Sequence, residues 1–198
     1  MAIFFVKQKL RKRPKMERSK VLITYTTMSG STQEIAEFVS NQFTYLGQPV
    51  ELHPCSEIKD LKAISGIVIG APIYMFHLHK EAHRFLQRHQ KSLVDLPVAV
   101  FAGGAYGPNA AQDALEVRKN LDNELAKFVW LKPVSVLLVG GRFDPARLRF
   151  PYNLIPALKQ APASDARNWE DIHAWVDSLP SLLANPIQQT LVEERSRS

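Results

Sequence analysis

The sequence is poor in cysteine, and the apolar run that opens it is short. Its one cysteine, Cys55, excludes an intramolecular disulfide, and a reducing cytoplasm is the default compartment for such a chain. A lone cysteine near a strand end is most simply a small buried apolar side chain. The N-terminal run Met1–Val6 is too short to span a bilayer as a helix.

Excess charge is missing from most of the chain. Residues 1–20 hold eight basic side chains and one acidic, whereas residues 21–198 hold 17 basic and 18 acidic. The net charge of +6 therefore belongs to the N-terminus, and the near-neutral remainder does not support a nucleic-acid-binding face. We expect residues 1–19 to be a basic leader that is disordered or a mis-assigned start, with Met16 as the true one. Alternatively, the leader makes a peripheral contact with the inner face of a membrane.

Motifs of several enzyme classes are also lacking. The loop that follows the first apolar run has neither a Walker lysine nor a Gly-x-Gly-x-x-Gly pattern, so a nucleoside triphosphate or NAD is not indicated there. A receiver domain needs acidic residues after the first strand, where this chain has Thr26–Met28. The chain has no Gly-x-Ser-x-Gly elbow, which argues against an esterase.

The stretch Val21–Thr32 is present instead, and it reads as a buried strand that feeds a phosphate-binding loop. A helix N-terminus has unpaired N–H groups and a partial positive charge, so hydroxyls and a glycine beside it can cradle an anion. Alternatively, a Ser/Thr-rich turn here only caps the helix. The candidate ligands are Thr27, Met28, Ser29, Gly30, Ser31 and Thr32.

These six residues fit a hydroxyl-x-hydroxyl-Gly-x-Thr pattern that resembles the phosphate loop of flavodoxins. The resemblance implies that FMN is the cofactor and that its single phosphate lies in this loop.

Along the rest of the chain, continuous apolar runs alternate with segments in which apolar residues recur at helical spacing. This predicts one α/β domain over residues 20–184, a flavodoxin-like doubly wound sheet of five parallel strands in the order 2-1-3-4-5 with helices on both faces. We expect a disordered tail at 185–198. After the first strand we predict strands at 48–53, 66–71, 97–102 and 134–139, and helices at about 32–46, 57–64, 80–90, from 109, and 169–182.

In that strand order the ligand crevice lies beyond the carboxyl ends of the first, third and fourth strands. The loops there carry aromatic residues with glycines or a proline, which suits the flat, apolar walls that a flavin ring needs. The candidate cofactor ligands in these loops are Pro72, Ile73, Tyr74 and Met75, followed by Gly103, Gly104, Ala105, Tyr106 and Gly107.

Three further stretches sharpen the resemblance, which covers about residues 20–183. They are Ile69–Tyr74 with His79 after it, Phe85–His89 leading to Pro97, and Trp169–Ile172. Within the flavodoxin superfamily they are most similar to the branch of menaquinone-dependent protoporphyrinogen IX dehydrogenases. The resemblance implies an FMN-dependent oxidoreductase that oxidises protoporphyrinogen IX or a related organic donor and passes electrons to a quinone. No side chain is assigned as catalytic.

A long connection at about 140–167 points the same way, because long loops are usually functional. Its guanidinium groups stand among aromatic residues, which suits a flat ring system that bears carboxylates. Alternatively, it packs its apolar side chains on the sheet edge with its arginines in water. The candidate substrate ligands are Arg142, Arg147 and Arg149.

Other interpretations stay open. The chain could be an electron carrier of the flavodoxin type without substrate chemistry of its own, or a cofactor-free interaction module. Carrier flavodoxins are acidic, and many have a glycine in the third-strand loop, whereas this chain has none between Gly70 and Gly103. His77, His79 and His83 raise the question of a metal, but no set of ligands completes it, so we expect none. His77 or His79 could instead pass protons near the flavin.

Overall fold

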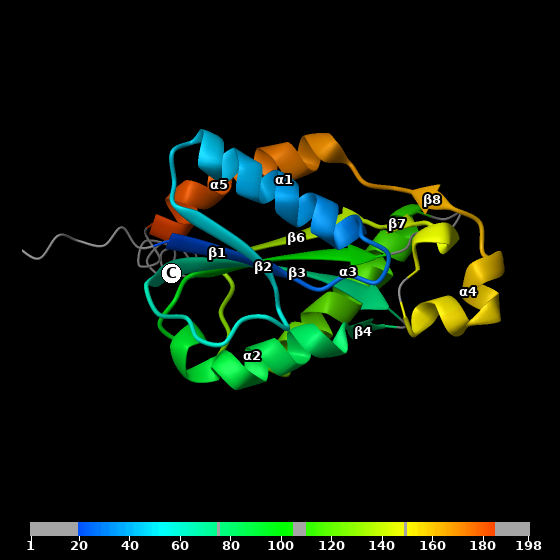
Figure 1. The fold of residues 1–198 in the computed structure, drawn as a ribbon, viewed down its shortest axis with the longest axis horizontal. Coiled ribbons are helices and arrows are strands. Elements are labelled where there is room, and N and C mark those ends of the chain that lie inside the picture. Colours follow the sequence, from blue (N-terminus) through cyan, green and yellow to red (C-terminus); the bar gives the residue numbers. More distant parts are fainter. Residues whose placement is uncertain (1–19, 75, 105–109, 149, 185–198) are drawn as a thin grey trace, which may run out of the picture.

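The computed structural model describes residues 20–74, 76–104, 110–148 and 150–184, apart from the side chains of 110–112. The expected leader and tail lie outside these ranges. Figure 1 shows the elements, which follow in the order β1 (Lys20–Tyr25), α1 (Ser31–Tyr45), β2 (Val50–Pro54), β3 (Ile64–Tyr74), β4 (His77–Leu78), α2 (Lys80–Leu93), β5 (Val98–Gly104), α3 (Ala110–Ala126), β6 (Ser135–Gly140), β7 (Arg142–Phe143), η1 (Pro145–Arg147), η2 (Tyr152–Leu154), α4 (Pro156–Gln160), β8 (Ser164–Asp165) and α5 (Trp169–Ala184).

The central sheet confirms the predicted fold class. Within the described residues its parallel strands lie in the order β2-β1-β3-β5-β6, and the short β4 pairs antiparallel with the end of β3. Counted among the parallel strands alone, this is the predicted order 2-1-3-4-5. β3 runs on to Tyr74, three residues beyond the predicted end. Its last residues therefore lie at the carboxyl edge of the sheet, beside Gly103 of β5.

Helices cover both faces of the sheet, as the alternation of strands and helices predicted. Figure 1 shows α1 and α5 on one face and α2 on the other. The side chains of each strand alternate between two separate cores, with Val68 on the α1 and α5 side and its neighbours Ile67 and Ile69 on the α2 side. Each fully buried aliphatic or aromatic side chain of this kind contributes about 2 kcal/mol. The sheet is therefore held from both sides.

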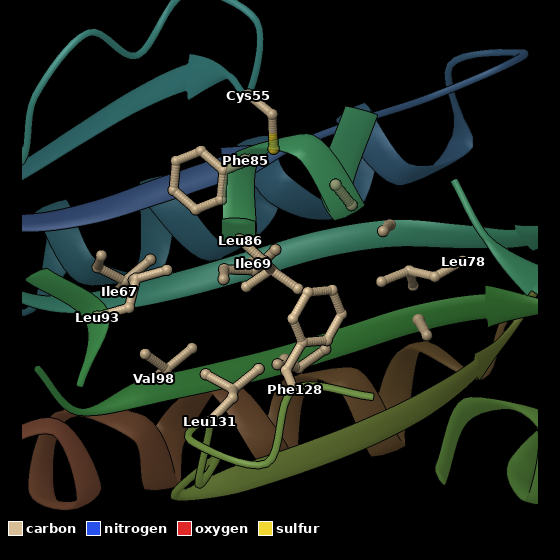
Figure 2. Packing of buried hydrophobic residues seen from close by; sticks show 14 of the residues in the cluster. Cys55, Ile67, Ile69, Leu78, Phe85, Leu86, Leu93, Val98, Phe128 and Leu131 are labelled. Carbon is tan, nitrogen blue, oxygen red and sulfur yellow. The ribbon is translucent and has the colours of Figure 1, made fainter. Parts of the chain in front are cut away.

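Figure 2 shows the core on the α2 side, where Phe85 and Leu86 of α2 and Phe128 pack over Ile69 and its neighbours. Cys55 lies at the margin of this core and is buried, as predicted. Burial raises the pKa of its thiol to about 12, which makes it an inert side chain.

One predicted helix is wrong. Residues 57–63 form turns and an irregular segment, not a helix, and Ile64 already begins β3; Ala63 has a φ of 59°. Two apolar side chains of this segment, Ile58 and Leu61, are buried in the core on the α2 side. A short segment has little helical stability of its own, so the packing of these two anchors decides its backbone.

The connection at 140–167, called the insertion below, contains short elements: β7, η1, η2, α4 and β8. β7 and β8 pair antiparallel at its base, and the Ala166 N–H donates to the Gly141 carbonyl at 3.0 Å. Figure 1 shows the insertion at the end of the molecule where β3 and β6 finish. Its two ends are thus held close to the carboxyl edge of the sheet. In the part of the chain that the structure describes, no helix is both long enough and apolar enough to cross a membrane.

Candidate functional site

A hydrogen bond within the loop between β1 and α1 stabilises its turn. Gly30 has a φ of 95°, a left-handed conformation that favours glycine, and it precedes the first residue of α1. The Gly30 N–H donates to the Thr27 hydroxyl at 2.9 Å. The loop therefore turns sharply into α1 and directs the first N–H groups of that helix towards the carboxyl edge of the sheet.

Two threonines at the base of this loop are buried. Thr32 is 3% exposed and Thr26 is 2% exposed. The Thr26 hydroxyl oxygen has no hydrogen-bond partner among the described residues. A buried hydroxyl without a partner is rare in a folded protein.

A cavity of about 310 Å³ opens at the carboxyl edge of the sheet. This volume is at the lower end of the range of ligand pockets, about 300–1,000 Å³. Residues from all three predicted loops line it, together with one of the predicted arginines: Met28, Ser29, Ser31, Pro72, Ile73, Tyr74, Gly103, Gly104 and Arg142.

The other predicted residues lie elsewhere. Thr27, Gly30 and Thr32 form the loop but are not part of the cavity wall, and Arg147 lies over Gly30. Met75, Ala105, Tyr106, Gly107 and Arg149 lie outside the described residues.

The sequence did not predict the apolar wall that faces these loops. The insertion provides it, through Gly141, Phe143, Leu148, Leu158, Ala161, Pro162 and Ser164. The sequence indicated only that the insertion is long and that its arginines stand among aromatic residues, and it gave no register. The walls of the cavity thus come from the sheet on one side and the insertion on the other.

Glu34, in the first turn of α1, gathers arginines from the insertion. Nη1 of Arg142 lies 3.1 and 3.0 Å from the two carboxylate oxygens, Nη1 of Arg147 lies 2.6 Å from Oε1, and Nη1 of Arg167 lies 2.8 Å from Oε2. Ser29 adds a link, because its hydroxyl donates to the Arg142 carbonyl at 3.5 Å. The insertion is therefore bound to the loop by charge-assisted hydrogen bonds.

Charges balance within this cluster. Arg142 also lies 3.7 Å from Asp144, and Arg167 lies 2.7 Å from Asp165. Burial raises the pKa of Glu34, but the hydrogen bonds from Arg167 and Arg147 outweigh it and hold that pKa below its ordinary value. The hydrogen bond from Arg167 likewise lowers the pKa of Asp165. These shifts favour the ionised forms of Glu34 and Asp165.

Sequence reasoning missed both Glu34 and Arg167. An acidic residue in the first turn of a helix is common because it complements the helix dipole, so Glu34 gave no distinct signal. Arg167 packs over the ring of Trp169, with 5.0 Å between its Cζ and the ring centroid, and its side chain is 5% exposed.

A second contact joins the insertion to the loop after β3. The Glu81 N–H donates to Nδ1 of His79 at 3.4 Å, so the proton of the neutral ring is on Nε2, which lies 3.2 Å from the Tyr152 hydroxyl. Burial lowers the pKa of His79 and so favours this neutral form. Tyr152 also makes an edge contact with Tyr74, with 6.2 Å between the ring centroids.

His77 and His83 lie away from the cavity lining, on either side of the Glu124 carboxylate. Nδ1 of His77 is 3.0 Å from Oε1, and Nε2 of His83 is 3.1 Å from Oε2. Lys127 binds the same carboxylate. Among the described residues, no group of three or more His, Cys, Asp or Glu is arranged to hold a metal ion.

Fold and cavity together define an α/β protein with a ligand site at the carboxyl edge of a doubly wound sheet. The family model described as "Flavodoxin domain" matches residues 22–154, and the chain therefore belongs to the flavodoxin domain family, a family of electron-transfer flavoproteins.

Two further similarities concern individual proteins. The chain is 28% identical over 85 residues to protoporphyrinogen IX dehydrogenase [quinone] of Escherichia coli K12, which is 42% of this chain and 47% of that protein. The match thus spans about half the length of that relative. The structure is also similar to a cysteine-to-serine mutant of flavodoxin from Pseudomonas aeruginosa, with a TM-score of 0.50 and 15% identity over 83% of this chain and 99% of that one.

The residues present fit a flavin. The loop before α1 offers hydroxyls and a left-handed glycine for a phosphate, and the orphaned Thr26 hydroxyl lies at its base. The cavity beside it has apolar walls that a flat ring system requires.

Proposed function

We propose that this chain binds FMN in the 310 Å³ cavity and is an oxidoreductase that passes electrons from a reduced organic donor to a quinone. One observation carries the proposal: the loop before α1, the carboxyl ends of β3 and β5 and the insertion all line the same cavity. Bound FMN supplies hydride and electron transfer. The chain's own residues bind and orient it.

Each wall has a distinct task in this proposal. Ser29, Ser31 and the first N–H groups of α1 hold the phosphate. Pro72, Tyr74, Gly103 and Gly104, which lie side by side at the ends of β3 and β5, would hold one face of the ring. The apolar side chains of the insertion exclude water from the reacting atoms.

Protoporphyrinogen IX or a similar reduced ring system is the donor class that we propose. The support is the likeness to the Escherichia coli dehydrogenase and the position of Arg142 in the cavity wall. A substrate carboxylate can replace Asp144, which lies 3.7 Å from Nη2 of Arg142. For each pair of electrons and pair of protons that the donor loses, one quinone takes up two electrons and two protons and becomes a quinol.

The test is anaerobic turnover. Purified protein is reconstituted with FMN, and its flavin absorbance is followed during addition of protoporphyrinogen IX and then of a menaquinone analogue. We expect bleaching by the donor and recovery with the quinone. Protein that binds FMN but is not reduced by the donor, while it exchanges single electrons with a reductant, is a carrier instead. Protein that binds no flavin is an interaction module.

A pair of glycine variants separates loss of the site from loss of stability. Gly30 and Gly47 both have positive φ, at 95° and 71°, so alanine strains the backbone at each by about 1 kcal/mol. Gly47 ends α1, and a Cβ there meets nothing within 4 Å. We expect Gly30→Ala to lose FMN and Gly47→Ala to retain it. Equal retention by both variants would place the phosphate elsewhere.

A further inference from the structure

We propose that Arg147 binds the phosphate of the cofactor, so that FMN and the insertion hold each other in place. The inference rests on the proposed function, since it concerns the phosphate of the same FMN. The sequence alone predicted that Arg147 binds a carboxylate of the substrate. The inference assigns it to the phosphate of the cofactor instead.

The position of the Arg147 side chain is the first observation. Its Nη1 lies 2.6 Å from Glu34 Oε1, and its Nη2 faces the loop, where a Cβ built on Gly30 would be 3.7 Å away. The two arms of one guanidinium group thus extend from a carboxylate to the turn that precedes α1. A planar guanidinium group can bind two oxygen ligands at once, and phosphate oxygens suit it as well as carboxylate oxygens do.

The other two arginines are already committed. Arg167 uses Nε and Nη2 for Asp165 and Nη1 for Glu34, and its side chain is 5% exposed. Arg142 binds both oxygens of Glu34 through Nη1 and approaches Asp144 through Nη2. The Arg147 side chain is 44% exposed, and in the described part of the chain its ion pair is with Glu34. Arg147 therefore has the freedom to turn an arm to a new anion.

Electrostatics explains why the loop needs this group. The Glu34 carboxylate stands in the first turn of α1, where it would repel a phosphate dianion at the same helix end. The guanidinium groups on Glu34 cancel that repulsion, and Arg147 adds a positive charge beside Gly30. Because Arg147 ends η1, a phosphate held by it also holds the insertion over the cavity. Linkage requires the reverse, that the closed insertion strengthens binding of the phosphate.

The experiment compares FMN with riboflavin, which lacks the phosphate. Dissociation constants are measured by quenching of flavin fluorescence with the full-length protein and with Arg147→Ala. We expect FMN to bind the variant about 10- to 100-fold more weakly, which is the size of one charge-assisted hydrogen bond. The dissociation constant of riboflavin should change by less than about threefold. Arg118→Ala is the matched control, since Arg118 is an exposed arginine that pairs with Asp122 on α3.

Each outcome decides between the claims. Wild-type protein that binds neither flavin overturns the proposed function and this inference with it. Wild-type protein that binds FMN, with Arg147→Ala unchanged or weakened equally for both flavins, overturns the inference alone. Arg147→Lys retains the charge without the fork, so we expect it to recover part of the lost preference for FMN.

Proteolysis gives a readout that is independent of affinity. Leu154, in the insertion, is 65% exposed and is followed by Ile155, so the bond after it is a site for chymotrypsin. At saturation with either flavin, we expect FMN to slow cleavage there more than riboflavin does, and Arg147→Ala to remove the difference. Equal protection of the wild-type protein by both flavins would overturn the link between phosphate and insertion.

Discussion

Two glutamates of this chain gather nitrogen-bearing side chains in contrasting ways. Glu34 stands at the rim of the cavity with a side chain that is 29% exposed, and its partners are arginines of the insertion. Glu124 is 3% exposed, and its partners His77, His83 and Lys127 come from β4, α2 and the residues just after α3. Both carboxylates join elements that are distant in the sequence.

The difference lies in what surrounds each carboxylate. Arg142 and Arg167 also pair with Asp144 and Asp165, and the Arg147 side chain is 44% exposed, so the cluster can turn one arginine to a ligand. Glu124 is the buried centre of its cluster and has no such alternative in the described part of the chain. We infer that the Glu34 cluster serves binding, while the Glu124 cluster holds the loop after β3 onto α3.

The largest expected effect is on stability at Glu124. Glu124→Gln keeps the shape of the side chain but removes its charge, which weakens hydrogen bonds to three partners. We expect the free energy of unfolding to fall by about 1–3 kcal/mol in urea denaturation at neutral pH. The control is Asp122→Asn on the same helix, where the exposed pair with Arg118 should cost less than about 0.5 kcal/mol. Equal losses would mean that burial of Glu124 adds nothing.

The same comparison can be made with pH. Burial raises the pKa of Glu124, but the hydrogen bonds from Lys127, His77 and His83 lower it to about 2. A folded-state pKa below the unfolded one gives stability that is present above about pH 4.5 and is lost as the pH falls towards 2. The stability gap between wild type and Glu124→Gln should therefore shrink between about pH 5 and about pH 2.5. A constant gap would show that the carboxylate is not the titrating group.

Arg167→Met should have an intermediate effect that is confined to the insertion. Methionine retains apolar contact with Trp169 but loses the bonds to Asp165 and Glu34. We expect a loss of about 1–2 kcal/mol and faster chymotryptic cleavage within the insertion. Arg118→Met is the control. Unchanged cleavage in Arg167→Met would mean that the apolar wall alone holds the insertion.

The smallest effect is expected at His77, whose side chain is 72% exposed although it binds Glu124. His77→Ala should lower the free energy of unfolding by about 0.5 kcal/mol, since contacts of exposed polar side chains contribute little. A double-mutant cycle with Glu124→Gln measures the coupling directly. A coupling above about 1 kcal/mol would mean that the exposed histidine contributes more than exposed pairs ordinarily do.

The order of the parallel strands was predictable because buried parallel strands are continuous apolar runs. Ile67–Ala71 is such a run, and the helical spacing around it left few ways to arrange the layers. The prediction of a helix at 57–64 failed because the apolar pattern there is too short to specify one. The positions of Ile58 and Leu61 are set instead by packing in the core.

The candidate site likewise has a part that the sequence predicted and a part that it did not. Thr27–Thr32, Pro72–Tyr74 and Gly103–Gly104 stand at strand ends, so the fold class alone brought them to one edge. The partners of the arginines could not be predicted from the sequence, because Glu34 is separated from Arg142 by 108 positions and from Arg167 by 133. No local pattern encodes a pairing over that distance.

The sequence by itself determined the alternation of strands and helices, the family and the edge of the sheet at which a ligand site forms, because these follow from local apolar spacing and from short motifs. Only the tertiary structure decided that the insertion forms the facing wall of the cavity and that its arginines converge on Glu34. The physical reason is that long-range ion pairs depend on where two surfaces meet. That meeting is set by packing of the whole domain and not by any stretch of the chain.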